Sequence, residues 1–306
     1  MEADAALARV AAEHHGVVSV SQARAVGLSL EQIKVRVRSG LLVPLHRGVY
    51  RHAAGTESPG SDLFAAVLAC GAGAVASHRS AGRLWGLRAV PRWRPEVTVP
   101  GRRRPRVDAI VVHRSDTLDP ADVAAAGGIP ATSVARTLLD LGSILPAPVL
   151  GTTTEDATIR GLVTPPDLVC TLERLGGPGR RGAAALRAVV RDMAPPAALE
   201  SRLEAALLRL IRASGAPPPV SQHEAAVAGG RRVRFDFAWP TRRIAVEADG
   251  RRWHATSADF QRDLARHNAV TAAGWRLYRY GWADVHQRPD ETRAALAAAL
   301  SQAGAA

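Results

Sequence analysis

Three acidic residues in the C-terminal part of the chain have the spacing of a carboxylate cluster on a β-hairpin. Two apolar, strand-like segments flank Thr241 and Arg242, which predicts an antiparallel pair of strands. If the turn is centred between these two residues, Asp236 faces Glu247 across the pair, with Cβ atoms about 4.5–5.5 Å apart. Asp249 lies two residues beyond Glu247 and therefore points to the same face of the sheet. The sequence thus predicts three converging carboxylates.

Opposed carboxylates repel each other, so this arrangement predicts a bound cation. Magnesium or manganese accepts carboxylate oxygens together with water and phosphate, and such an ion activates water for attack on a phosphodiester. We therefore expect Asp236, Glu247 and Asp249 to hold a divalent metal in a nucleic-acid hydrolase site. Two residues complete the expected catalytic set: Glu200 on the helix that precedes the sheet, and His254, which could shuttle a proton or contact phosphate.

An alternative without a metal pairs the acids with arginines. In that case Asp236 and Glu247 are half-exposed strand residues beside neighbours such as Arg234 and Arg243. The apolar residues that flank both acids mark core strands, where an unpaired carboxylate is costly. This cost favours the metal site.

The elements that must position these acids form the third region of the chain, residues 195–306. A proline pair precedes an apolar stripe that predicts a long helix, and strand-like segments follow it. In order, we expect a helix at 197–213, strands at 220–227, 232–239 and 243–248, a helix at 257–273, a strand at 275–280 and a helix at about 290–302. This αβββαβα order predicts an α/β domain with a mixed sheet.

A set of short motifs runs through this region. They are Asp236-Phe237-Ala238-Trp239-Pro240, Ile244-Ala245-Val246-Glu247-Ala248-Asp249-Gly250, Trp253-His254, Asp259, Arg262-Asp263, Arg266 and Ala273-Gly274-Trp275-Arg276. Over about residues 198–300 the chain resembles the very-short-patch-repair (Vsr)-like endonucleases, a branch of the restriction-endonuclease-like PD-(D/E)XK superfamily. The resemblance implies a sheet-centred nuclease fold that uses Mg²⁺, with Asp236 and Glu247 as metal ligands and Glu200 as the helical acid.

The chain departs from that superfamily at one position. The lysine that normally stands two residues after the second acid is replaced by Asp249, and no other lysine occurs in this region. Asp249 is therefore either an additional ligand or the mark of a degenerate site. His254 and Arg262 are the residues that could supply the missing positive charge.

The first region, residues 1–54, has the spacing of a helix-turn-helix followed by a β wing. Helical patterns occur up to residue 39, and apolar and polar side chains alternate from residue 41 to 50. The helix at 29–39 is the candidate DNA-recognition helix. The expected DNA-binding residues are Gln32, Lys34, Arg36 and Arg38 of this helix and Arg47 of the wing. A small helical packing domain with solvated arginines is the alternative.

The segment from Val20-Ser21-Gln22-Ala23-Arg24 to Arg47-Gly48-Val49-Tyr50 carries a second resemblance. It resembles the N-terminal winged helix of type IV abortive-infection (AbiEi) antitoxins, which are DNA-binding repressors. The resemblance covers about fifty residues and continues more loosely into the middle region. It implies DNA as a partner and a toxin as a second partner.

The middle region, residues 58–191, mixes helical and strand-like segments and predicts an α+β domain. Helices are expected at 62–68 and 77–87, and strands at 96–99 and 109–113.

Five polar residues of the middle region are given local, structural roles. Ser77 is expected to cap the helix that follows it. His78 and His113 each precede an arginine and are interpreted as structural residues, and Asp116 and Asp140 as caps or surface residues. No catalytic role is assigned here.

Composition narrows the class of partner. The 306 residues carry a formal net charge of +12, nearly all from arginine since Lys34 is the sole lysine, and this favours nucleic acid. No apolar run reaches the roughly 18–20 residues that cross a bilayer, and the acidic start has no secretion signal, so we expect a cytoplasmic protein without a membrane partner. Cys70 and Cys170 lack metal-site spacing and are expected to be buried.

Two functional hypotheses follow for this multidomain α/β and α+β chain. In the first, a winged helix brings a metal-dependent endonuclease domain to DNA. In the second, the nuclease-like domain is degenerate and the chain is a non-enzymatic, antitoxin-like transcriptional regulator. The missing lysine favours the second hypothesis.

Overall fold

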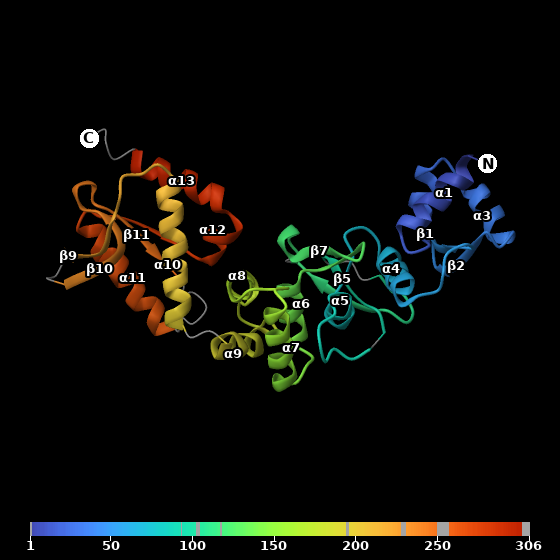
Figure 1. Cartoon of the computed structure of the whole chain (residues 1–306), viewed down its shortest axis with the longest axis horizontal. Coiled ribbons are helices and arrows are strands. Elements are labelled where there is room, and N and C mark those ends of the chain that lie inside the picture. The colour runs from blue at the N-terminus through green and yellow to red at the C-terminus, as the bar shows by residue number, and fades with distance from the viewer. Residues whose placement is uncertain are drawn as a thin grey trace. The chain divides into compact units, whose positions relative to one another are not determined.

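The computed structural model describes residues 2–92, 94–101, 105–116, 118–193, 196–227, 231–249 and 257–301. The chain forms two compact units (Figure 1). The first comprises Met1–Val163 with Ala184–Leu186, and the second comprises Thr164–Ala183 with Arg187–Ala306. Both units mix helices with sheets, so the expected multidomain mixture of α and β elements is confirmed. The first predicted region lies in the first unit, whereas the second predicted region, residues 58–191, extends into the second unit at residues 164–183 and 187–191. The division into three domains stays a prediction.

The N-terminal part of the first unit contains the predicted helices and wing. Its elements are α1 (Glu2–Glu13), β1 (Val17–Ser19), α2 (Val20–Ala25), α3 (Leu30–Arg38), β2 (Leu42–His46) and β3 (Val49–His52). The strands form an antiparallel sheet in the order β1-β3-β2. Capping boxes start α2 at Ser19 and α3 at Ser29, and Gly27 provides the left-handed turn between the two helices. A small apolar core holds α3 in place: Leu7, Val18, Ala23, Leu28, Ile33 and Leu42.

The rest of the first unit is an α+β fold around a five-stranded sheet. Its elements are α4 (Pro59–Cys70), β4 (Val75–Ala76), α5 (His78–Leu84), β5 (Glu96–Pro100), β6 (Val111–Ser115), η1 (Pro120–Asp122), β7 (Val123–Ala126), β8 (Ile129–Thr132), α6 (Val134–Leu141) and α7 (Ala147–Ile159). The strand order is β6-β5-β4-β8-β7, and β5 and β6 run parallel. The predicted helices and strands of this region are confirmed, whereas β4, β7, β8 and α7 were not expected.

Ser77 stands at the N-cap position of α5 as predicted, although its side chain makes no capping hydrogen bond. The role assigned to Asp140 was wrong. Asp140 is neither a cap nor a surface residue, because it is 3% exposed and pairs with the buried Arg136. Arg136 also pairs with Asp122, which is fully buried. A buried arginine needs such partners, since a charge taken out of water without one is strongly destabilising.

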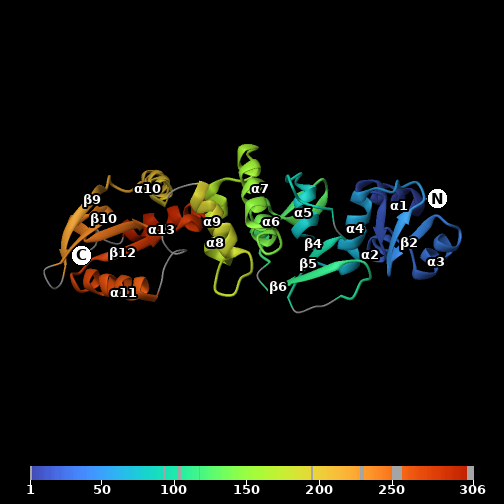
Figure 2. The same cartoon turned by 90° about the horizontal axis from the view of Figure 1, so that it is seen from below.

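The second unit contains the expected αβββαβα core. Its elements are α8 (Pro165–Leu175), α9 (Ala183–Met193), α10 (Pro196–Ala213), β9 (Val220–Val227), β10 (Arg231–Trp239), η3 (Pro240–Arg242), β11 (Ile244–Ala248), α11 (Ser257–Ala272), β12 (Arg276–Tyr280), α12 (Trp282–Gln287) and α13 (Pro289–Ser301). The sheet has the order β12-β11-β10-β9, with β11 and β12 parallel and the other pairs antiparallel. Figure 2 shows α10 and α11 on opposite faces of this sheet. The predicted mixed sheet is confirmed, and α12 is an addition to it.

Within the described part of the chain, no helix is long and apolar enough to cross a membrane.

Candidate functional site

The β10–β11 hairpin has the register expected from its turn. Phe237 pairs with Val246 and Trp239 with Ile244, so the turn is centred as predicted. The backbone ladder ends one pair before the two acids would meet. Asp236 takes part in a different contact there, because its Oδ2 accepts a hydrogen bond from the backbone N–H of Ala248 at 2.9 Å.

Glu247 is 8% exposed and is held by an arginine from the helix that covers the sheet. Arg266 of α11 donates from Nη1 to Oε2 of Glu247 at 2.9 Å, and from Nη2 to Oε1. The hydrogen bond to Glu247 raises the pKa of Arg266 above its usual value. Glu247 is therefore paired with an arginine, as the alternative without a metal expected. Its partner is Arg266 and not the predicted neighbours Arg234 and Arg243.

A second arginine, Arg279, lies among the carboxylates of Glu247, Asp249 and Asp263. Arg279 of β12 is the parallel-strand neighbour of Glu247, with Nε 3.9 Å from its Oε2. The same Nε lies 3.5 Å from Oδ2 of Asp249, and Nη2 donates to Oδ1 of Asp263 at 2.9 Å. This hydrogen bond lowers the pKa of Asp263. Arg279 thus connects β11 with α11 through their carboxylates.

Glu204 of α10 is a third acid in the neighbourhood of Glu200 and Asp236. Burial raises the pKa of Glu204, and the negative charges of Asp236 and Glu200 raise it further. Glu204 therefore has two carboxylates as electrostatic neighbours, one on its own helix and one on β10. Its Oε2 also accepts a weak hydrogen bond from Gln222 of β9 at 3.4 Å.

Sequence reasoning missed Glu204, Arg266 and Arg279, although helical spacing could have found two of them. Glu204 follows Glu200 by one helical turn, so the two share a face of α10. Arg266 shares a face of α11 with Asp263 and with the buried Val270, and that face must contact the sheet. Nothing local to β12 marks Arg279 as the partner of two acids.

The expected metal and proton-transfer roles stay predictions. His254 lies outside the described residues. Arg262, a candidate for the missing positive charge, is exposed on α11, and Arg266 one turn later is the cation at Glu247. Among the described residues, three metal-ligating side chains with ligand atoms within 4.8 Å of one another occur only at His78, Glu96 and His113, far along the sequence from the predicted acids.

The candidate DNA-binding residues do not form one surface. Gln32 accepts from the backbone N–H of Ser29 at 2.8 Å and so completes a capping box. Arg36 turns back to α1, where its Nε donates to Oδ1 of Asp4 at 2.6 Å. This hydrogen bond lowers the pKa of Asp4. These two side chains have roles inside the N-terminal domain.

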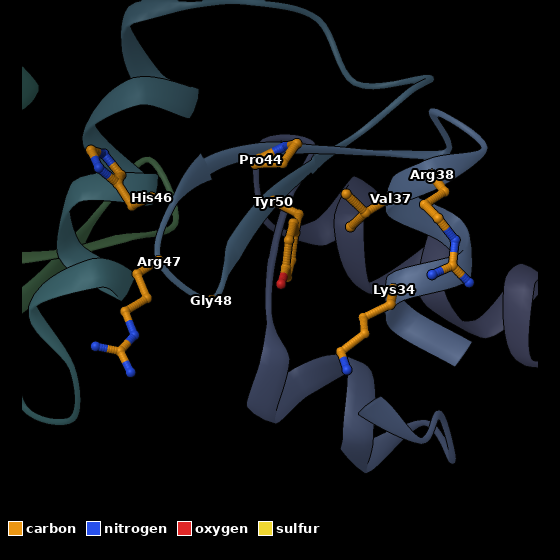
Figure 3. A pocket seen from close by; sticks show the side chains of 8 residues that line it. All are labelled: Lys34, Val37, Arg38, Pro44, His46, Arg47, Gly48 and Tyr50. Carbon is orange, nitrogen blue, oxygen red and sulfur yellow. The ribbon is translucent and has the colours of Figure 1, made fainter. Parts of the chain in front are cut away.

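The other three candidates line one hollow between α3 and the wing (Figure 3). Lys34 and Arg38 project from α3 on one side, Arg47 projects from the tip of the wing on the other, and Tyr50 stands between them. All three cations are exposed, and Lys34 also donates to Glu31 at 2.6 Å on the helix surface. Helix and wing together present positive charge around an aromatic ring.

The N-terminal region matches a known protein family, and a larger part of the chain is similar to a solved structure. Residues 5–52 match the family model described as "Transcriptional regulator, AbiEi antitoxin", which confirms the antitoxin resemblance of the winged-helix region. A solved structure, the crystal structure of the RV2827C protein from Mycobacterium tuberculosis, covers 61% of this chain and 76% of its own chain, with 18% identity and a TM-score of 0.41. The endonuclease resemblance stays a prediction.

Two Mycobacterium tuberculosis proteins are similar to almost the whole chain. They are the uncharacterized proteins Rv2248 (strain ATCC 25618 / H37Rv) and MT2308 (strain CDC 1551 / Oshkosh). Each is 30% identical over 284 residues, which span 90% of this chain and 98% of the relative. The chain therefore belongs to the family of Rv2248 and MT2308 and begins with an AbiEi-antitoxin-type regulator domain.

Proposed function

We propose that this chain is a DNA-binding protein that docks on duplex DNA through α3 and the wing. The observation that carries the proposal is the shared hollow of Lys34, Arg38 and Arg47 within a domain that matches a transcriptional-regulator family. In winged helices the recognition helix enters the major groove while neighbouring elements contact the backbone. Lysine and arginine at that boundary bind phosphates and set the register of the protein on the duplex.

The net charge of the whole chain supports the same partner. A net charge of +12 favours encounter with a polyanion and makes the affinity depend on salt. The predicted contacts of Gln32 and Arg36 are secondary in this proposal, because both side chains already have partners inside the domain.

Fluorescence anisotropy with labelled duplexes tests the proposal. One duplex carries the region upstream of the protein's own gene and another is an unrelated sequence of equal length. We expect the triple variant Lys34→Ala, Arg38→Ala, Arg47→Ala to lose binding to both duplexes. Arg9→Ala, which removes an exposed cation from α1, is the matched control and should bind as the unmodified protein does. Equal losses in the triple variant and the control would contradict a docking surface at the hollow.

We propose phosphodiester hydrolysis by the second unit as a second function. The observation that favours it is the electrostatic setting of Glu204: burial raises its pKa, and repulsion from the Asp236 and Glu200 carboxylates raises it further. Such repulsion is relieved by a divalent cation. Bound there, Mg²⁺ or Mn²⁺ would supply an activated water and neutralise charge on the phosphoryl group.

Glu204 and Asp236 fit a metal ion better than Glu247 and Asp249 do. Glu204 and Asp236 are coupled by repulsion and could each give an oxygen ligand. Glu247 does not fit in the same way, since Arg266 binds both of its carboxylate oxygens. Asp249 lies beside Arg279. Ligation by Glu247 and Asp249, as the endonuclease resemblance implies, requires these arginines to move to other partners.

A cleavage assay separates this second function from a purely regulatory one. Duplex and single-stranded DNA are incubated with the full chain, with and without Mg²⁺ or Mn²⁺. An endonuclease requires the metal and loses activity in Asp236→Asn and Glu204→Gln, whereas Asp290→Asn, at an exposed acid of α13, stays active. DNA binding without cleavage identifies an antitoxin-like regulator, for which a toxin partner should then be sought by co-purification.

A further inference from the structure

Two histidines and a glutamate, distant in sequence, come together in the first unit. His78 is the first residue of α5, Glu96 the first of β5, and His113 lies in the middle of β6. The chain order β4-α5-β5-β6 and the parallel pairing of β5 with β6 bring them to one place. Their ligand atoms all lie within 4.8 Å of one another. His78 and Glu96 are buried and His113 is half-buried.

The imidazole rings are held in unusual positions. The rings of His78 and His113 stack with centroids 3.6 Å apart and planes 18° from parallel. Nδ1 of His78 lies 3.0 Å from Oγ of Ser77. The backbone of His78 has φ +50°, a left-handed conformation that costs energy in a residue other than glycine. Local strain of this kind is concentrated at functional sites.

Two buried polar atoms at the cluster have no hydrogen-bond partner among the described residues. One is Nε2 of His113, and the other is Oγ1 of Thr98, which is 1% exposed. Thr98 pairs with His113 across the two strands and lies two residues from Glu96 on β5, so it shares their face of the sheet. A buried polar atom without a partner is destabilising, and a ligand at this point would remove that destabilisation.

The glutamate is oriented by a neighbouring arginine. Arg79 donates its backbone N–H to Oε2 of Glu96 at 2.9 Å and Nη1 to Oε1 at 2.7 Å. A carboxylate oxygen has a second lone pair, so these contacts leave Glu96 able to bind a cation. Because Arg79 offsets the charge of Glu96, the cluster attracts a cation mainly through the imidazole nitrogens. That property favours zinc-like ions over magnesium or calcium.

We propose that His78, Glu96 and His113 form a binding site for one divalent transition-metal ion of the zinc class. Each histidine supplies a ring nitrogen and Glu96 supplies one oxygen. Tetrahedral ligation at about 2.0–2.2 Å places ligand atoms about 3.3–3.6 Å apart, so binding draws the three side chains together and opens the stacked rings into a V. Water fills the fourth position, on the face that holds Thr98. The ion ties α5 to β5 and β6.

Metal analysis of the full chain tests the proposal. The purified protein is stripped with a chelator, given ZnCl₂, freed of excess metal and assayed for zinc content and thermal unfolding. We expect one zinc per chain and a higher Tm with Zn²⁺ but not with Mg²⁺. His113→Gln and Glu96→Gln should weaken zinc binding by about 100-fold or more, since even outer-shell changes weaken such sites 10–100-fold. His46→Gln, at a wing histidine outside the cluster, should keep the ion.

Cobalt spectra keep the test decisive if a variant fails to fold. Co²⁺ bound to the unmodified chain should give the strong visible bands of tetrahedral coordination. His113→Cys retains a ligating atom, so it should still bind Co²⁺ and add a sulfur charge-transfer band. A zinc content far below one per chain, an octahedral cobalt spectrum, or full zinc binding by His113→Gln and Glu96→Gln would each overturn the proposal.

Discussion

Arg266 of α11 and Glu247 of β11 form a two-point ion pair, in which Nη1 lies 2.9 Å from Oε2 and Nη2 donates to Oε1. Arg266 thus neutralises the negative charge of the buried Glu247 carboxylate. Arg266 lies on the same face of α11 as Asp263 and Val270. Any metal ligation by Glu247 would therefore compete with Arg266 for both carboxylate oxygens.

The first prediction concerns the contribution of this ion pair to the free energy of unfolding. Arg266→Met should destabilise the second unit by about 1–3 kcal/mol, because it leaves the buried Glu247 carboxylate without its two strongest hydrogen bonds. The double variant Arg266→Met, Glu247→Gln should recover most of that loss. Urea unfolding of the four proteins in this cycle measures the coupling. Additive effects would show that Arg266 and Glu247 do not stabilise each other.

The second prediction is a pH dependence at Glu204. Its folded-state pKa is raised above the ordinary value of 4.5, first by burial and then by Asp236 and Glu200. The folded chain therefore binds this proton more tightly, and the stabilisation is complete below the ordinary pKa and lost as pH rises through the folded value. Glu204→Gln should then unfold at a higher Tm than the unmodified chain at pH 7, with no difference near pH 4. The exposed Glu291→Gln of α13 is the control. A lower Tm for Glu204→Gln at pH 7 would refute the assignment.

The hairpin shows what the sequence can predict here. The turn at Thr241 and Arg242 lies between two apolar strands, and this local pattern was enough to predict the register. Asp236 and Glu247 are not paired in the ladder, and the side chain of Asp236 instead accepts a hydrogen bond from the backbone N–H of Ala248. Register follows from local turn geometry, whereas the end of a ladder depends on individual side chains.

The long-range partners could not be predicted in the same way. Arg266 meets Glu247 only after α11 docks on the sheet, and His78 meets His113 only after β5 and β6 pair in parallel. Helical spacing places Arg266 on the face of α11 that covers the sheet, but its partner and that of His78 depend on helix docking and strand order in the whole fold. The two histidines were interpreted as structural because each precedes an arginine, and no local pattern indicated that their rings would stack.

The third prediction concerns Arg136. It donates from Nε to both oxygens of Asp140 at 3.1 Å and from Nη1 to Oδ2 of Asp122 at 3.3 Å, and all three side chains are almost fully buried. Arg136→Met should destabilise the first unit by about 3–5 kcal/mol, because two buried carboxylates lose their shared cation. Arg88→Met removes an exposed arginine 3.7 Å from Asp156 and should cost less than about 1 kcal/mol. Similar denaturant midpoints for the two variants would contradict the buried network.

The fourth prediction concerns the two thiols. Burial raises the pKa of Cys70 to about 11 and that of Cys170 to about 12, as expected of buried cysteines in an apolar setting. At pH 8 the thiolate fraction of each is then on the order of one in a thousand or less, and neither sulfur is accessible. A thiol reagent should label no cysteine in the native chain and two in denaturant. Rapid labelling before unfolding would show that one site opens locally.

The fifth prediction separates DNA contacts from internal ones on α3. Lys34, Arg38 and Arg47 surround the hollow, whereas Arg36 donates to Asp4 of α1. If the three cations neutralise phosphates, each single alanine variant should lower the slope of log affinity against log salt by about 1. Arg36→Ala should leave that slope unchanged and instead lower Tm, because α3 loses its link to α1. Titrations at several salt concentrations measure the slopes. A slope that falls for Arg36→Ala and not for Arg38→Ala would move the DNA-binding surface to the other side of α3.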